Sequence, residues 1–186
     1  MGMKKYLWIL VAVVILLGIY VWSAYNGLVT KKEAVTNQWA QVETQYQRRL
    51  DLIPNLVESV KGIMKQEQAI FDNLAEARTK YAGSVTINDK AAAATQVESA
   101  LGRLLAVVEN YPTLKSSENV QTLMVQLEGT ENRISVERKN YNDDVRALNV
   151  VIKRFPTNVV AGLFGFAEQT YFEAAAGAEN APAVQF

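Results

Sequence analysis

Apolar residues from position 28 onward recur at alternating intervals of three and four, the spacing of helices that pack along a left-handed seam. Four such runs can be counted: Leu28–Ile53, Leu56–Tyr81, Val97–Tyr111 and Leu127–Ile152. Short connections make sequential helices antiparallel neighbours. We therefore predict an all-α fold in which the runs form an up-down-up-down four-helix bundle with coiled-coil-like packing.

Helix-breaking and helix-capping residues lie between the runs. Pro54 disfavours helical geometry in the residue before it, so we expect a turn there that separates the first two helices. The alternative is that Pro54 only kinks one long helix, because no glycine or polar loop surrounds it. Further breaks are expected at "GSVTIND", where Asn88 or Asp89 can cap a helix, and at "YPTLKSSEN", where Ser116 or Ser117 can.

An uncharged apolar run, Tyr6–Trp22, precedes the bundle. Extended to Tyr25 it is about 20 residues long, and at ~1.5 Å per residue it spans a hydrocarbon core of roughly 30 Å. Tyrosine and tryptophan residues at both of its ends are typical of membrane interfaces. The sequence "VWS" before Ala24 is a poor signal-peptidase site, so we expect a retained transmembrane helix. With no proline before Ile53, that helix could run unbroken into the bundle.

The distribution of charge suggests an orientation and three regions. Lys4 and Lys5 favour a cytoplasmic N-terminus, although Lys31 and Lys32 compete from the other side. We expect a single-pass protein whose bundle is extracytoplasmic, on the periplasmic side. Every lysine and arginine lies at or before Arg154. The predicted domains are a transmembrane anchor at 1–25, a helical bundle at 26–155, and an apolar, acidic tail with a short helix at 156–186.

The composition excludes several classes of chemistry. The chain has no cysteine and no histidine, which removes disulfides, thiolate nucleophiles, catalytic triads and the usual zinc and haem ligands. Its 19 basic and 19 acidic residues form no basic block, so we expect no nucleic-acid binding. Glu128 and Glu131 are a carboxylate pair at helical spacing, but Arg133 and Arg138 would repel a cation. We expect no enzymatic activity, no catalytic or metal-binding residues and no cofactor.

Six charged residues lie on or beside the apolar seams. Unpaired buried charges cost several kcal/mol, so we expect those on the seams to neutralise one another or to reach water at an edge, and to fix the register of the helices. The functional alternative is an anion site between helices, built on Arg48, Arg49 and Arg138. The predicted structural charged network consists of Arg48, Arg49, Asp51, Glu67, Glu131 and Arg138.

Aromatic residues crowd the segment after the last long run. This segment has no basic residue beyond Arg154 and is interrupted by Gly162 and Gly165, so it is too apolar for a free tail. It can pack back on the bundle as a short helix, contact the bilayer surface, or contact a neighbouring chain. We favour lateral contact, because the last helix descends toward the membrane and neighbours there are held at high effective concentration. The interaction candidates are Phe155, Phe164, Phe166, Tyr171 and Phe172.

Several sequence blocks resemble, in order and spacing, the signature blocks of LemA-family proteins: "YNGLV", "QYQRRLDLIPNLVESVKG", "LGRLLAVVENYPTLKSSENVQ", "LEGTENRISVERKNYND", and "FPTN" followed by "GF". The resemblance runs from Tyr25 to Phe186. It implies a membrane anchor and an antiparallel, bromodomain-like four-helix bundle, usually in the cell envelope, with no established enzymatic activity. A magnetosome-formation branch implies membrane-organising work for some members. Many relatives resemble lipoproteins with a cysteine before the "YN" block, where this chain has "VWSAYN", so we expect no lipidation.

Three functional hypotheses follow. The first is a non-enzymatic, membrane-anchored scaffold or adaptor that self-associates as a homo-oligomer and positions membrane proteins of the envelope. The second is an extracytoplasmic sensor whose inter-helix arginines hold an anionic ligand. The third is an accessory subunit of a membrane protease, which the gene neighbourhoods of the resembling family suggest.

Overall fold

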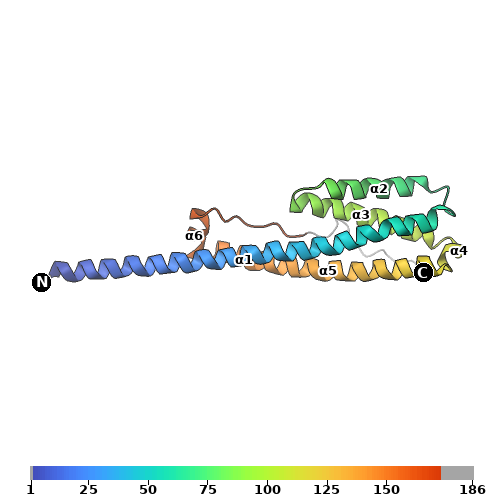
Figure 1. The fold of residues 1–186 in the computed structure, drawn as a ribbon. Coiled ribbons are helices and arrows are strands. Elements are labelled where there is room, and N and C mark those ends of the chain that lie inside the picture. Colours follow the sequence, from blue (N-terminus) through green and yellow to red (C-terminus); the bar gives the residue numbers. More distant parts are fainter. Residues whose placement is uncertain (1, 173–186) are drawn as a thin grey trace, which may run out of the picture. The chain divides into compact units, whose positions relative to one another are not determined.

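The computed structural model describes residues 2–172, and within them the chain is helical, with six helices and no strand (Figure 1). The predicted all-α class is confirmed. The chain divides into two compact units. Residues 2–40 and 139–171 form what we call the anchor unit, and residues 41–138 together with Phe172 form the helical unit. The helices are α1 (Gly2–Lys61), α2 (Gln68–Gly83), α3 (Ile87–Val108), α4 (Pro112–Lys115), α5 (Glu118–Lys153) and α6 (Thr157–Leu163).

The first helix, α1, continues through Pro54 and ends at Lys61. The turn predicted at Pro54 is therefore wrong, and the alternative of one long helix is correct. A proline inside a helix removes one backbone hydrogen bond, but Ile53 and Leu56 on either side are 1% and 0% exposed, so core packing holds the helix together across the gap. The unbroken continuation of the apolar run into the next helix is confirmed.

The connection between the first two helices lies at residues 62–67 instead. Met64 within it is fully buried, whereas Ile63, which the apolar spacing placed on the seam, is 49% exposed. The second apolar run is thus divided between the end of α1 and α2, and Leu56, Val60, Leu74 and Tyr81 of the run are still buried.

Segments of four helices meet in the core of the helical unit. Tyr46 of α1 packs against Tyr81 of α2, with their ring centroids 5.5 Å apart. Arg49 of α1 reaches Glu98 of α3 and Thr130 of α5. The helices α2 and α3 lie side by side and are joined by a short connection (Figure 1). The contacts therefore bring one segment from each of the four predicted apolar runs into a common core.

The start of α3 differs from the prediction. Thr86 is its N-cap residue, and the Thr86 hydroxyl oxygen accepts a hydrogen bond from the Asp89 backbone N–H at 3.1 Å. Asp89 is thus three residues beyond the cap and its carboxylate accepts a bond from the same hydroxyl at 2.6 Å, so the expectation that Asn88 or Asp89 caps the helix is wrong. At the other predicted break, α5 begins at Glu118, directly after Ser117.

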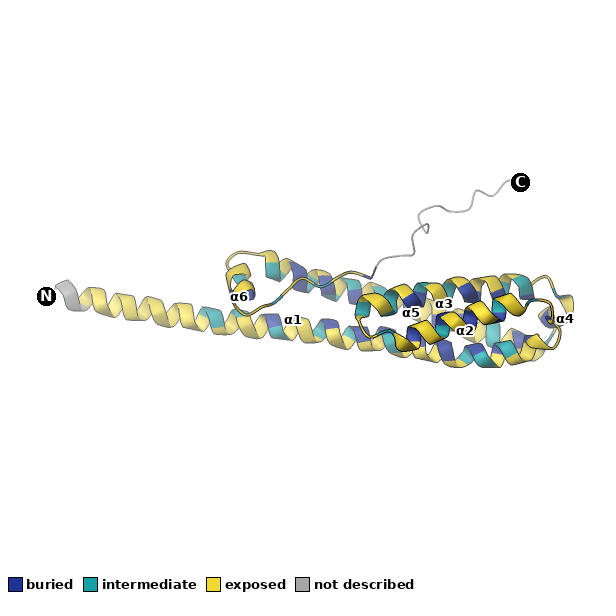
Figure 2. Ribbon diagram, turned by 90° about the horizontal axis from the view of Figure 1, so that it is seen from above, coloured by how far each residue is buried: buried dark blue, intermediate teal, exposed yellow. Residues whose placement is uncertain are grey.

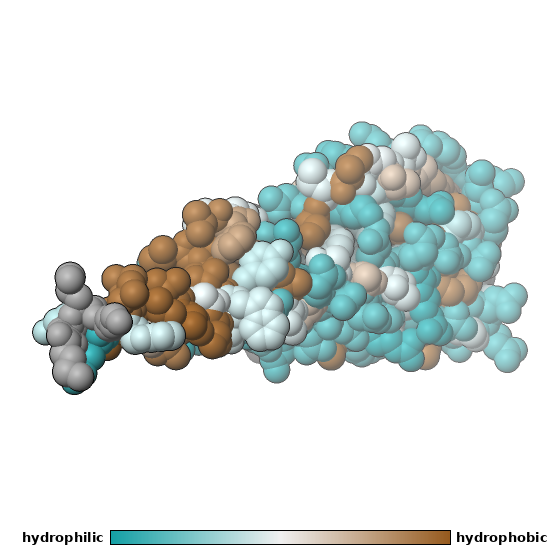
Figure 3. All heavy atoms as spheres, turned by 60° about the vertical axis from the view of Figure 1, so that its left-hand side comes forward, coloured by the Kyte–Doolittle hydropathy of each residue, from teal (hydrophilic) through white to brown (hydrophobic). Residues whose placement is uncertain are grey.

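The N-terminal part of α1 is exposed almost throughout (Figure 2), and its apolar residues are exposed at successive positions, from Tyr6 to Val11 for example. Trp8 is 73% and Leu16 65% exposed, and hydrophobic residues gather over this part of the molecule (Figure 3). Within residues 2–172, α1 is the helix that is long and apolar enough to cross a membrane. A helix that is apolar all round, with none of its most apolar window buried, has the surface expected of a segment surrounded by lipid.

Beyond this apolar part, α1 packs against the C-terminal part of α5 within the anchor unit. The Trp39 and Tyr141 rings meet edge to face with centroids 5.4 Å apart, and Leu28, Val145 and Leu148 are at most 1% exposed. After α5 the chain turns, forms α6, and returns toward residue 172 (Figure 2). This arrangement places the last described part of the chain against both long helices.

Candidate functional site

A cluster of polar and charged side chains lies inside the helical unit, with Glu98 at its centre. One Glu98 oxygen, Oε1, accepts hydrogen bonds from the Tyr46 hydroxyl at 2.8 Å, from Arg49 Nη1 at 3.5 Å, and from Arg138. Arg49, which is 1% exposed, also donates to Glu131 and, through Nε, to the Thr130 hydroxyl at 3.3 Å. We call Tyr46, Arg49, Glu98, Glu131 and Arg138 the charged cluster.

The charged cluster is balanced, with two arginines and two glutamates. Arg138 lies between two aromatic rings, with its Cζ 5.4 Å from the centroid of Tyr46 and 4.3 Å from that of Phe172. Burial lowers the pKa of Arg138 to about 10, so it remains cationic at neutral pH. Glu131 is 53% exposed and carries one end of the cluster to water. This geometry links α1, α3 and α5 through charge-assisted bonds.

The structure brings together three of the six charged residues that the sequence singled out, Arg49, Glu131 and Arg138. Arg48 and Asp51 are exposed, and Asp51 accepts a hydrogen bond from Gln47 at 2.9 Å. Glu67 is the N-cap residue of α2. Arg48, Asp51 and Glu67 therefore lie outside the charged cluster.

The central residue, Glu98, was not predicted from the sequence. It follows Val97 on the third apolar run, and the helix places it between Ala94 and Leu101, both buried. Glu98 is four residues after Ala94 and three before Leu101, and this helical spacing is the signal that could have revealed it. Two of the three arginines proposed for an anion site, Arg49 and Arg138, are paired with Glu98 and Glu131, and the third, Arg48, is exposed outside the charged cluster.

Glu98 makes the stability of the protein depend on pH. Burial and, second, the charge of Glu131 raise the pKa of Glu98 from 4.5 to about 7, while Arg49 acts in the opposite direction. Because the folded chain holds this proton more tightly than the unfolded chain, the stabilisation is complete below pH 4.5 and is lost as the pH rises to about 7.

We therefore expect the wild-type protein to gain about 2 kcal/mol in unfolding free energy, relative to Glu98→Gln, when the pH falls from about 8 to about 5. Chemical denaturation of the detergent-solubilised protein at both pH values measures this difference. The exposed Glu128→Gln is the matched control. Equal pH dependence in wild type and Glu98→Gln would show that Glu98 keeps its ordinary pKa in the folded protein.

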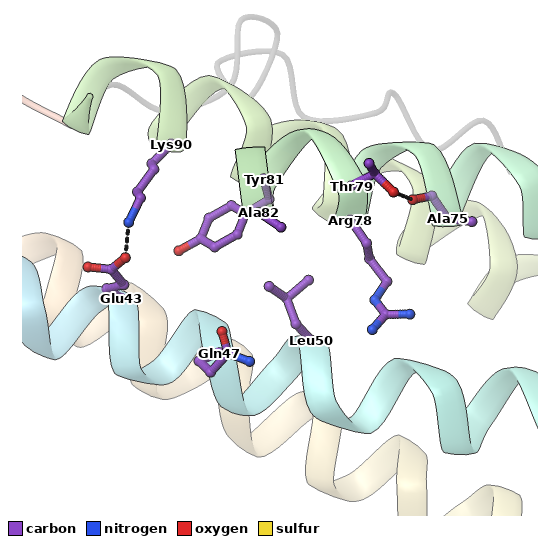
Figure 4. Close-up of a pocket in the computed structure, with 9 residues that line it drawn as sticks. All are labelled: Glu43, Gln47, Leu50, Ala75, Arg78, Thr79, Tyr81, Ala82 and Lys90. Carbon is purple, nitrogen blue, oxygen red and sulfur yellow. Dashed lines mark hydrogen bonds and ion pairs between the residues drawn. The ribbon is translucent and has the colours of Figure 1, made fainter. Parts of the chain in front are cut away.

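A groove of about 520 Å³ lies between α1, α2 and the start of α3 in the helical unit (Figure 4). The Tyr81 hydroxyl points from α2 toward α1, and Lys90 forms an ion pair with Glu43 across the groove (Figure 4). Tyr81 is 5% exposed, and neither its hydroxyl nor the Arg78 Nε has a hydrogen-bond partner among the described residues. Burial and then Glu43 raise the pKa of Tyr81, so the hydroxyl remains a donor. The groove can thus offer a hydroxyl and a guanidinium to a small polar molecule.

The acidic residues of the described part of the chain form no group of three or more that could hold a metal ion.

Further polar interactions lie in the anchor unit. Residues 164–171, which we call the return segment, run back from α6. Asn149 of α5 is 5% exposed; its side-chain nitrogen donates to the Gln169 carbonyl at 2.8 Å, and its oxygen accepts from the Gln169 backbone N–H at 2.9 Å. The Tyr141 hydroxyl donates to the Thr170 carbonyl at 3.1 Å, and Lys153 pairs with Glu168 at 2.8 Å. Three of these four contacts are therefore made by backbone groups of the return segment, and the fourth by the Glu168 side chain.

Replacing Asn149 with leucine is expected to release the return segment, because it leaves both backbone groups of Gln169 without their partner at a cost of about 1–3 kcal/mol. Hydrogen exchange of the solubilised protein should show loss of protection around Gln169, while the core of the helical unit is unchanged. The control is Asn158→Leu, an exposed asparagine on α6. Retained protection in Asn149→Leu would mean that other contacts hold the segment.

The aromatic candidates of this region fall into different surroundings. Phe164 and Phe166 pack against Tyr25, with ring centroids 4.9 and 5.8 Å apart. Phe172 is buried over Arg138 in the helical unit. Phe155 and Tyr171 are 77% and 45% exposed. Phe164 remains 48% exposed, so three of the five aromatic side chains offer a substantial free surface.

Comparison with known proteins identifies relatives. Residues 38–186 match the model of the LemA family. The magnetosome proteins MamQ 1 and MamQ 2 of Paramagnetospirillum magneticum are each 29% identical to this chain over 175 residues, and the magnetosome protein MamQ of Magnetospirillum gryphiswaldense is 28% identical over 174. Each match covers 80% of this chain and 64% of the relative, so the chain spans less than two thirds of the length of these curated relatives.

Proposed function

Because this chain belongs to the LemA family, we propose that it is a membrane-anchored, non-enzymatic scaffold or adaptor that self-associates and positions other membrane proteins of the cell envelope. The observation that carries the proposal is the continuity of α1, which runs from the exposed apolar part into the core of the helical unit without a break. Arg49 of the charged cluster lies on this same helix. A helix that carries both an exposed apolar part and a member of a paired polar core suits a protein whose task is to hold partners at a membrane.

The relatives support a structural role. They are named as magnetosome proteins, which associates them with a cellular structure and with no stated reaction. The charged cluster adds to this argument, since its carboxylates and guanidinium groups are paired with one another across three helices. Side chains paired in this way favour a fixed helix register, which supports a structural role for the charged cluster.

The proposed topology has the N-terminus in the cytoplasm and the helical unit on the extracytoplasmic side. Protease added to cells with a permeabilised outer layer should digest the helical unit and spare an N-terminal tag. Digestion of the tag with protection of the helical unit would reverse the topology. A mature protein that begins near Ala24 would remove the anchor altogether.

Self-association is proposed to use the segment 157–186. Within its described part, Phe164 is 48% exposed and packs on Tyr25 beside the anchor, where a neighbouring copy in the same membrane is held at high effective concentration, and Tyr171 is 45% exposed. The test is cross-linking in membranes of the wild type and of a variant that lacks residues 157–186, with circular dichroism to check the fold. We expect the helical signal to persist and the ladder of cross-linked oligomers to shorten. A full ladder from the truncated protein would contradict this part of the proposal.

A second candidate function is the binding of a small anion, and the groove beside Tyr81 favours it. The groove contains Arg78 and Lys90 against one carboxylate, Glu43, and the buried Tyr81 hydroxyl has no hydrogen-bond partner within residues 2–172. Native mass analysis of the detergent-solubilised protein separates the two candidates. A discrete oligomer without additional mass supports the scaffold, whereas a monomer with a co-purifying small molecule supports the sensor.

A further inference from the structure

The short helix α6 exposes an apolar surface that the anchor unit does not cover. Val159 and Leu163, one helical turn apart, are 62% and 76% exposed, and Phe155 just before the helix is 77% exposed. The opposite side of α6 is packed inward, with Val160 and Ala161 at 4% and 1% exposure. We call Phe155, Val159 and Leu163 the α6 patch.

Contacts with α1 fix the level of the α6 patch along that helix. The hydroxyl groups of Tyr20 and Thr157 are hydrogen-bonded at 3.1 Å, and the rings of Tyr25 and Phe164 are 4.9 Å apart. Tyr20 belongs to the exposed apolar run of α1, and Tyr25 follows the end of that run. The helix α6 therefore lies level with the last turns of the apolar run and not with the polar part of α1.

The charged residues near the α6 patch lie outside it, on the side of the polar part of α1. The sequence from Phe155 to Ala167 has no charged residue. Arg154, immediately before it, is exposed, and Lys32 of α1 lies 5.9 Å from the ring of Phe166, farther along α1 than Tyr25. An apolar face with exposed cations beside it, at the end of a membrane-spanning segment, matches the boundary between acyl chains and headgroups.

We propose that the α6 patch inserts into the membrane interface beside α1, so that the protein meets the same leaflet with two elements, one that crosses it and one that lies in it. This inference rests on the proposed anchoring by α1. The occupant of the patch is lipid, because the patch is continuous with the apolar surface of α1 through the Tyr20 and Tyr25 contacts. A second contact of this kind would restrict the tilt of α1 in the membrane.

The absence of native cysteine allows a direct test with the full-length protein in phosphatidylcholine vesicles. A nitroxide label is attached to one cysteine at a time, in Val159→Cys and Leu163→Cys. Ile15→Cys in the apolar run serves as the membrane reference, and Val125→Cys on α5, an exposed valine of the helical unit, serves as the water reference. Power-saturation electron paramagnetic resonance compares collisions of each label with oxygen and with a water-soluble nickel chelate.

We expect labels at positions 159 and 163 to show an oxygen-to-nickel collision ratio severalfold above that at 125 and below that at 15. A ratio at 159 and 163 equal to that at 125, with a lipid-like ratio at 15, would overturn the insertion of α6 and leave the anchor intact. A water-like ratio at 15 would instead overturn the anchoring itself. Spin–spin broadening at 163 without the raised ratio would assign the patch to a second copy of the chain and also overturn the proposal.

Discussion

Replacing Glu98 with alanine is expected to lower the free energy of unfolding by about 3 kcal/mol, because it removes the carboxylate shared by the buried Arg49 and the partly buried Arg138. Arg138, 20% exposed, would lose the carboxylate to which it is bound. Arg49, 1% exposed, would keep only Glu131 as a charged partner, and Glu131 is itself half in water. Breaking a buried ion pair costs about 3–5 kcal/mol when one charge is left uncompensated, and the partial exposure of the cluster favours the lower end.

Chemical denaturation of the solubilised protein at pH 8, followed by circular dichroism, measures this loss. Glu128→Ala, on the exposed side of α5, is the matched control and should change stability little. The Glu98→Ala/Arg138→Ala double variant should be more stable than the sum of the single losses predicts, because it removes the uncompensated charge together with its partner. If Glu98→Ala unfolds at the same denaturant concentration as Glu128→Ala, the arginines have water or other acceptors and the charged cluster does not fix the helices.

The apolar spacing predicted most of the core of this protein. Leu28, Val42, Val97, Leu104 and Ile134 all fall on the predicted seams and are at most 3% exposed. The spacing is informative because side chains on a helix return to the same face roughly every 3 to 4 residues, and apolar side chains on one face pack against a neighbouring helix. The same pattern also predicted the direct passage of the anchor into the next helix, since no breaking residue intervenes.

Two errors arose where a local preference competed with packing. Pro54 disfavours helix locally, but the buried neighbours Ile53 and Leu56 keep α1 continuous. Asn88 and Asp89 are good capping residues, yet Thr86 starts the helix because its hydroxyl can bond both the backbone and the side chain of Asp89. In both cases the local preference of the residue type was interpreted correctly, and the competing interaction came from a residue one to three positions away.

The charged cluster and the return segment could be predicted only in part, because their partners are distant in the sequence. Arg49 and Arg138 were recognised as charges on apolar seams, whereas Glu98, which lies beside a seam, belongs to the cluster only once α3 packs against α1. Asn149 gave no signal, since an asparagine on a long helix is usually exposed, and its role depends on the backbone of Gln169. Such pairings follow from tertiary packing and have no period in the sequence.

Replacing Trp39 with alanine is expected to have the largest effect in the anchor unit, a loss of about 3–5 kcal/mol in unfolding free energy, because a large core side chain is deleted. Trp39 is 8% exposed and meets the ring of Tyr141 edge to face at 5.4 Å. Tyr141, in turn, holds the return segment through its bond to Thr170, so the cavity should also loosen that segment. Two measurements are needed, thermal unfolding of the solubilised protein and hydrogen exchange around residue 170.

Trp22→Ala is the matched control for this variant, because it deletes the same side chain at a position that is 70% exposed in the apolar run. We expect Trp22→Ala to unfold at the wild-type temperature in detergent and to keep the protection of the return segment. Trp39→Phe should recover part of the loss, since it restores an aromatic ring beside Tyr141. If Trp39→Ala unfolds at the same temperature as Trp22→Ala, the contact between α1 and α5 in the anchor unit contributes little to stability. The return segment would then depend on Asn149 for its position, and Asn149→Leu alone should release it.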